Sequence, residues 1–239
     1  MTANASRTHD IDVADVEYVR HGDKPLLARL FRPRGSGPFP LVVEAHGGAW
    51  CRGDRSNDTV INEPLAKSGV VVAALDFRMP PEAAYPASLA DINYAIRWLK
   101  ARAGEFGSRP DLVGILGSSS GAHQAMLAAM RPRDPRYAAV PLHASAAAVD
   151  ASVRCVVMCW PVIDPLGRYQ HAKQLKEAGD AARPGPQLDR FVTRYRQAGG
   201  QVEVELLEGE SEGFMTRNPN SPTAKHAIEK IIEFVRKPS

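Results

Sequence analysis

Apolar residues along this chain gather in short runs bounded by turn residues, which is the pattern expected of strands. The runs between residues 40 and 160 are continuously apolar, as in a parallel sheet covered by helices on both faces. The first and last runs alternate apolar and polar residues, as edge strands do. The predicted strands are 26–31, 40–45, 70–76, 112–117, 154–160 and 201–207.

Apolar residues at helical spacing lie between these runs and after the last one. One set begins after Pro86, and another begins at Ser221-Pro222, a usual start for a helix. Alternating strands and helices predict an α/β fold with a mostly parallel central sheet and helices on both faces. The sets are Leu89, Ile92, Ile96 and Leu99; Leu188, Phe191, Val192 and Tyr195; and Ile228, Ile231, Ile232 and Val235.

The segment Gly117-Ser118-Ser119-Ser120-Gly121 joins the predicted strand 112–117 to a helical segment. In a nucleophile elbow, the central serine of G-x-S-x-G occupies a strained strand-to-helix turn, and the glycines allow close backbone approach. Ser119 is therefore a candidate nucleophile, with Gly117 and Gly121 as supporting residues. A non-catalytic turn rich in serine and glycine would give the same pattern. The neighbouring segments are therefore needed to distinguish a nucleophile elbow from such a turn.

A second glycine-rich segment, His46-Gly47-Gly48-Ala49-Trp50, follows the predicted strand 40–45. Paired glycines after a central strand can present backbone N–H groups to a developing oxyanion. We expect the amides of Gly48 and Ala49 to form an oxyanion hole together with the amide of Ser120. Gly47 and His46 are expected to support the loop, with the His46 ring bonded to backbone.

Taken together, three segments resemble the α/β-hydrolase fold. They read "HGGAWCRGDR", "DFRMPPEAAYPASLADINYAIRWL" and "GSSSGAH". The resemblance is to the carboxylesterases related to hormone-sensitive lipase and to the kynurenine-formamidase-like esterases with an H-G-G-x-W loop. It spans residues 25–165 and 187–236, so it predicts a single domain over 1–239. It implies hydrolysis of a small carboxylic ester, or a related amide, through an acyl-enzyme on Ser119.

The general base of that family is a histidine within a late pattern like E-G-x-x-H-G-F. The matching stretch here is "EGESEGFM", residues 208–215, so Glu212 stands in the histidine position. A glutamate has a reference pKa of about 4.3 and is a weak base toward a serine hydroxyl. Glu212 could serve only if burial raised its pKa by several units; otherwise it is a solvated loop residue.

The family's triad acid is an aspartate at the end of a strand for which only residues 165–186 are available, and these contain no apolar run. The cap is therefore reduced or not represented, and 165–186 is either a cap remnant or contains a join across a missing segment around 180–186. Asp164, at the end of the predicted strand 154–160, is the alternative acid, although capping a helix is the commoner role of such an aspartate. His123, His171 and His226 are expected to be structural.

Composition and the absence of certain sequence patterns argue against several classes of partner and cofactor. Lys and Arg number 30 against 27 Asp and Glu, scattered along the chain, so nucleic acid is not an expected partner. No apolar run approaches the length of a membrane span, and the opening residues lack a secretory pattern, so a cytoplasmic location is expected. The three cysteines lack metal-ligand spacing, and no G-x-G-x-x-G or Walker lysine follows a strand, so neither metal nor cofactor is predicted.

Two functions remain in competition at this point. The first is a serine esterase acting on a small-molecule ester, with its base unresolved. The second is a catalytically impaired protein of the same fold that binds a small molecule, because Glu212 replaces the expected histidine. The sequence leaves a homodimer open, with 201–207 or the last helix as the pairing element.

Overall fold

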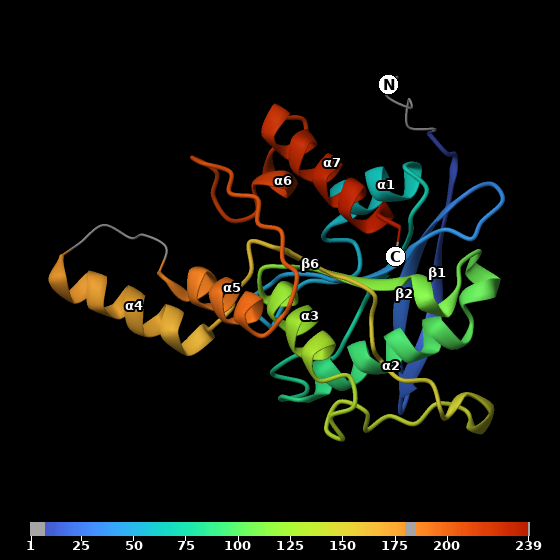
Figure 1. Cartoon of the computed structure of the whole chain (residues 1–239). Helices are drawn as coiled ribbons and strands as arrows, with labels where there is room; N and C mark the ends of the chain where they lie inside the picture. The colour runs from blue at the N-terminus through green and yellow to red at the C-terminus, as the bar shows by residue number, and fades with distance from the viewer. Residues whose placement is uncertain (1–7, 180–184, 239) are drawn as a thin grey trace.

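The computed structural model describes residues 8–179 and 185–238, which form a six-stranded mixed sheet flanked by helices (Figure 1). The strand order across the sheet is β1-β2-β4-β3-β5-β6. β1 pairs with β2, and β2 with β4, in antiparallel fashion, whereas β4, β3, β5 and β6 are parallel. The strands are β1 (Ile11–His21), β2 (Lys24–Pro33), β3 (Leu41–Ala45), β4 (Val71–Leu75), β5 (Val113–Ser118) and β6 (Val156–Cys159).

Helices cover both faces of this sheet. α1, α6 and α7 lie on one side and α2 and α3 on the other (Figure 1). The helices are α1 (Thr59–Lys67), α2 (Ala87–Ala101), α3 (Ser120–Met130), α4 (Pro165–Ala178), α5 (Gln187–Gln197), α6 (Phe214–Arg217) and α7 (Pro222–Arg236), with short 3₁₀ helices at Ala103–Phe106, Pro110–Leu112 and Ala144–Ala146.

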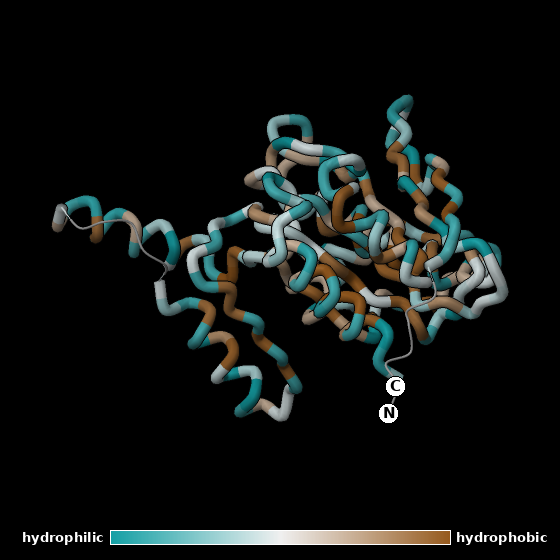
Figure 2. The backbone as a smooth tube through the Cα atoms, turned by 90° about the horizontal axis from the view of Figure 1, so that it is seen from above, coloured by the Kyte–Doolittle hydropathy of each residue, from teal (hydrophilic) through white to brown (hydrophobic). Residues whose placement is uncertain are grey.

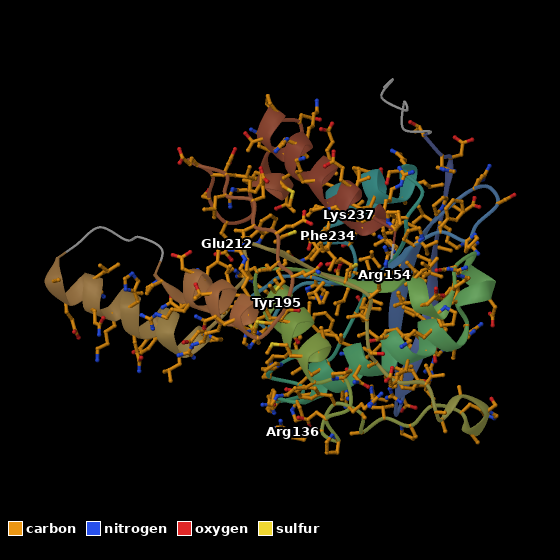
Figure 3. The ribbon with its side chains drawn as sticks, viewed as in Figure 1. Arg136, Arg154, Tyr195, Glu212, Phe234 and Lys237 are labelled. Carbon is orange, nitrogen blue, oxygen red and sulfur yellow. The ribbon has the colours of Figure 1, made fainter. Side chains whose placement is uncertain are left out.

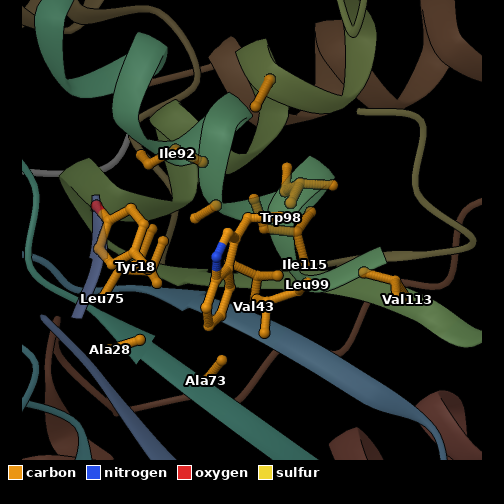
Figure 4. Close-up of a cluster of buried hydrophobic side chains, with 14 of the residues drawn as sticks. Tyr18, Ala28, Val43, Ala73, Leu75, Ile92, Trp98, Leu99, Val113 and Ile115 are labelled. Atoms are coloured by element: carbon orange, nitrogen blue, oxygen red, sulfur yellow. The ribbon is translucent and has the colours of Figure 1, made fainter. Parts of the chain in front are cut away.

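The continuous apolar runs of the central strands are explained by two separate cores. Successive side chains of a strand point to opposite faces, so Val43 and Val42 of β3 enter different clusters. Figure 4 shows the cluster beneath α2 and α3, where Trp98 and Tyr18 pack over Val43 and Ala73. The second cluster lies under α1, α6 and α7. Burial on both faces is what fixes β3, β4 and β5 as the middle of the sheet.

The structure confirms most of the predicted elements. The runs from 26–31 to 154–160 are β2 to β6, and the three predicted helices are α2, α5 and α7. Ser221 caps α7 by accepting a hydrogen bond from the Ala224 amide at 3.1 Å. The alternating strand β2 is not an edge, however, because β1, which the sequence pattern did not predict, pairs along it.

The prediction of a strand at 201–207 is wrong, because this described segment has no regular secondary structure. Leu206 is 73% exposed and Val204 is 40% exposed. A strand needs a neighbour that satisfies its backbone groups. The sheet of the described residues ends at β6, and the additional strand expected of the family is not found among them, so the alternating pattern at 201–207 has no ladder to join.

Residues 165–186, for which a reduced cap was predicted, include α4, and α5 begins directly after them. In Figures 1 and 2, which view the molecule from two directions, these helices project from the side of the body. Leu166 and Tyr169 on α4 are each 65% exposed. The suggested join across a missing segment falls largely on residues 180–184, which lie outside the described residues, and the single-domain assignment stays a prediction.

Candidate active site

Ser119 lies in a strained turn between β5 and α3. Its backbone angles are φ 50° and ψ −115°, a conformation that costs free energy for a residue with a Cβ. Two close approaches explain the flanking glycines. A Cβ on Gly117 would lie 2.4 Å from the Gly121 carbonyl oxygen, and a Cβ on Gly121 would lie 2.0 Å from that of Ala45. The turn is therefore compressed against β3, with glycine required on either side of Ser119.

The hydroxyl of Ser119 donates a hydrogen bond to Oε1 of Glu212, which lies on the loop before α6 and is labelled in Figure 3. The other carboxylate oxygen, Oε2, accepts from Nη2 of Arg168 on α4 at 3.1 Å. The Glu212 side chain is 46% exposed, so this arrangement lies at the surface. The structure thus brings Glu212 to the candidate nucleophile, in the place where the family has its histidine.

The electrostatic surroundings of Glu212 make it an anion and not a strong base. Partial burial raises its pKa, but the hydrogen bonds from Ser119 and Arg168 and the charge of Arg217 outweigh that effect, and the pKa lies below its usual value. The raised pKa set above as the condition for an efficient base is therefore not met. Glu212 can accept the Ser119 proton geometrically, but with little driving force.

The loop after β3 runs directly beside Ser119. A Cβ built on Gly47 would lie 3.3 Å from the Cβ of Ser119. Gly48 has φ 128° and Ala49 has φ 54°, so the chain turns sharply here. Among the described residues, the amides of Gly48, Ala49 and Ser120 have no hydrogen-bond acceptor. Free N–H groups on a loop and a helix N-terminus next to a serine are the elements of an oxyanion site.

His46 is buried under this loop, with its ring stacked on Phe77 at a centroid distance of 4.4 Å. Its Nδ1 lies 2.6 Å from the Gly47 carbonyl oxygen, the bond to backbone that the sequence analysis expected. Burial lowers its pKa, which keeps the ring neutral. His46 therefore shapes the loop from below, with no hydrogen bond to Ser119 among the described residues.

The remaining candidates lie elsewhere. Asp164 caps α4, its Oδ1 accepting from the Gly167 amide at 2.9 Å, and it makes no hydrogen bond to Ser119 or Glu212. Nδ1 of His123 lies 2.8 Å from the Val162 carbonyl oxygen. None of the histidines in the described part of the chain is bonded to Ser119 or Glu212, His171 and His226 included. The structure thus gives Asp164 the capping role that the sequence analysis named as the commoner one.

Two features of this site are absent from the sequence predictions. Nothing around Arg168 in the sequence indicates that α4 carries this side chain to Glu212. The hydroxyl of Ser118, next to Ser119, donates to Oδ2 of Asp58 at 2.6 Å and accepts from the Gly47 amide at 2.9 Å. A clue to the second existed, since a serine at the end of a buried strand needs hydrogen-bond partners.

Residues 8–179 and 185–238 contain no group of three or more His, Cys, Asp or Glu side chains placed to hold a metal ion. Within the same ranges, no helix has both the length and the apolar character that crossing a membrane requires. An open cavity of about 420 Å³ lies at the far end of α3 from Ser119, lined by Met130, Arg131, Pro132, Arg133, Asp134, Pro135, Asp150 and Ser152.

Several solved structures that match this fold are named as esterases. The structure matches that of esterase 2 from Thermogutta terrifontis with a TM-score of 0.76 at 20% identity, covering 93% of each chain. It matches the esterase of Pyrobaculum calidifontis with a TM-score of 0.73 at 19% identity, covering 95% of this chain and 86% of that one. The chain therefore has the α/β-hydrolase fold that the sequence resemblance implied.

Relatives found by sequence similarity are also named as ester hydrolases. The chain is 32% identical over 130 residues to the probable carboxylic ester hydrolase LipM of Mycobacterium tuberculosis, and 31% identical over 134 residues to the versiconal hemiacetal acetate esterase of Dothistroma septosporum. These matches cover 54% and 55% of this chain but only 30% and 39% of the relatives' lengths. The resemblance to carboxylesterases stated above is confirmed. The BD-FAE family matches residues 30–183, more than half of the chain, and the chain belongs to that family.

Proposed function

We propose that this chain hydrolyses small carboxylic esters through an acyl-enzyme on Ser119. The observation that carries the proposal is the position of the Ser119 hydroxyl. It lies in a strained turn and donates a hydrogen bond to a carboxylate, beside a loop whose Gly48 and Ala49 amides have no acceptor in the described part of the chain. The relatives named as esterases support the same chemistry. A related amide is the second substrate class that the same steps would cleave.

In the first half of the reaction, Ser119 Oγ forms a bond to the ester carbonyl carbon while its proton passes to Oε1 of Glu212. The carbonyl π electrons move onto the oxygen, which accepts hydrogen bonds from the amides of Gly48, Ala49 and Ser120. Collapse of this intermediate breaks the ester C–O bond, and the departing alkoxide takes the proton from Glu212. The acyl group remains on Ser119.

In the second half, water attacks the acyl carbon and gives a proton to Glu212. Collapse of this second intermediate breaks the bond between the acyl carbon and Ser119 Oγ, which takes the proton back from Glu212, and the carboxylic acid is released. Because the pKa of Glu212 is below its usual value, both proton transfers lack driving force and turnover should be slow. Arg168 supports this site by holding Glu212 in the orientation that reaches Ser119.

Covalent labelling tests the proposal directly. The chain should react with a fluorophosphonate at Ser119, identified by peptide mass, and should release p-nitrophenol from p-nitrophenyl acetate in a burst equal to one acyl group per chain. Ser119→Ala should abolish labelling and burst, whereas Ser145→Ala, a change at an exposed serine remote in sequence, should preserve both. Folded protein that takes no label would contradict the proposal.

The alternative, a protein that binds a small molecule without catalysis, predicts binding of esters with no acylation. The feature that this alternative would explain is Glu212 in the place of a histidine, with a pKa below its usual value, but the relatives' names do not support it. The labelling experiment separates the two, because a binding protein would be stabilised by an ester without forming a covalent adduct.

A further inference from the structure

A chain of buried polar groups lies beneath the loop that carries the proposed oxyanion donors. Its hydrogen bonds run from Asp58 at the start of α1 to Ser118 at the end of β5 and on to the Gly47 amide, and Glu44 on β3 is buried next to Asp58. Glu44, Asp58 and Ser118 are 0%, 4% and 2% exposed. A buried polar group without a hydrogen-bond partner costs free energy, because it has lost the hydrogen bonds that it would make to water.

The direction of these hydrogen bonds is fixed by the number of protons. Ser118 has one hydroxyl proton, and it lies in the bond to Oδ2 of Asp58 at 2.6 Å. The Ser118 oxygen is then free to accept from the Gly47 N–H at 2.9 Å. A buried acceptor at Asp58 therefore determines how Ser118 is oriented, and Ser118 determines how the first peptide of the loop is oriented.

Glu44 is buried next to Asp58. Burial and the neighbouring charge of Asp58 raise the pKa of Glu44 well above its usual value, which favours its neutral form. Nδ2 of Asn62 lies 3.4 Å from its Oε2. Asp58 Oδ2 is the acceptor for the Ser118 hydroxyl.

Gly47 immediately precedes Gly48 and Ala49, whose amides are the proposed oxyanion donors, so the orientation of the Gly47 peptide is transmitted to them along a very short stretch of backbone. We propose that Ser118 and Asp58 are positioning residues, which hold the Gly47–Ala49 loop with its free amides toward the carbonyl carried by Ser119. This inference rests on the proposed function for its catalytic consequence. The hydrogen-bonded chain itself does not depend on it.

The test compares Ser118→Ala with Ser108→Ala. Ser108 is the matched control, because it is also buried and its hydroxyl has no partner among the described residues. Displacing catalytic groups slightly costs up to about 100-fold in rate. We expect Ser118→Ala to lower kcat for p-nitrophenyl acetate and the maximal fluorophosphonate labelling rate by about 10- to 100-fold with KM little changed. Ser108→Ala should leave all three at the wild-type level.

A second readout does not depend on catalysis. Loss of the Ser118 acceptor should speed hydrogen exchange at the Gly47 amide by about 10-fold, the factor for one net hydrogen bond, and Ser108→Ala should not. Unchanged exchange in Ser118→Ala overturns the inference, and so does an unchanged kcat. If wild-type protein takes no label, the proposed function fails, while the exchange experiment still decides the inference.

Asp58 provides a test that remains valid if Ser118→Ala does not fold. Asp58→Asn keeps an oxygen that can accept from Ser118, whereas Asp58→Ala removes it. We expect Asp58→Asn to retain most of the labelling rate and Asp58→Ala to lose about 10-fold or more. Equal rates in the two variants would overturn the inference.

Discussion

Replacing Glu212 by glutamine isolates the role of the carboxylate at this site. Glutamine keeps the side-chain length and an oxygen that can accept the Ser119 hydrogen bond, but it cannot take up the proton. The substitution also removes one charge from a side chain that is 46% exposed, so its effect on folding should be small. A change in acylation would then report proton transfer and not loss of structure.

The expected magnitude follows from general-base catalysis, which contributes about 10²- to 10⁴-fold. Glu212 should lie at the low end of that range, because its pKa is below the usual glutamate value and the driving force for taking the serine proton is small. A loss of about 100-fold corresponds to about 2.7 kcal/mol in the activation free energy.

The assay is the single-turnover release of p-nitrophenol, with protein in excess over p-nitrophenyl acetate, so that only acylation is measured. Glu210→Gln, which removes an exposed carboxylate two positions away, is the matched control and should react at the wild-type rate. If Glu212→Gln acylates as fast as Glu210→Gln, another group takes the proton, and the assignment of Glu212 as the base is wrong.

Three further predictions address the pH dependence, the turn and the buried acid pair. Arg168→Met should move the acid limb of the pH–rate profile upward, because it removes one of the bonds that lower the pKa of Glu212; an unmoved limb would contradict that role. Gly121→Ala should lower the thermal midpoint markedly, since its Cβ would lie 2.0 Å from the Ala45 carbonyl oxygen and overpacking costs about 1–3 kcal/mol or more; a wild-type midpoint would rule out the compressed turn. Glu44→Gln should gain stability relative to wild type as pH rises. The raised folded-state pKa means that the wild-type contribution of Glu44 is complete below about pH 4.5 and declines above it, while glutamine does not titrate. Urea midpoints at pH 5 and pH 8 check this, and a difference between the proteins that does not change with pH would refute it.

Local sequence patterns were enough to define the frame of the site. The apolar runs gave β3, β4 and β5, because burial on both faces demands apolar residues at successive positions. The spacing of Gly117, Ser119 and Gly121 indicated a strand-to-helix turn, since only glycine permits the close approaches found there. These features depend on a few consecutive residues, and the sequence displays them directly.

The limits of pattern reasoning appear at the sheet edges. The segment 201–207 alternates as a strand does, yet whether a strand forms depends on a neighbour with unpaired backbone groups, which no local pattern encodes. β1 shows the opposite case, in which a strand forms although the local pattern does not predict one. Its residues are mixed in polarity, and its stability comes from pairing along β2.

By itself, the sequence determined which residues are able to carry the chemistry: a serine in a tight turn, glycines on a loop, and a glutamate in the place of a histidine. Only the tertiary structure decided which of them meet. Ser119 and Glu212 are 93 positions apart, and Ser118 and Asp58 are 60 apart. The physical reason is that backbone conformation follows from neighbouring residues, whereas a hydrogen bond between distant side chains depends on how whole helices and strands pack, to within a fraction of an ångström.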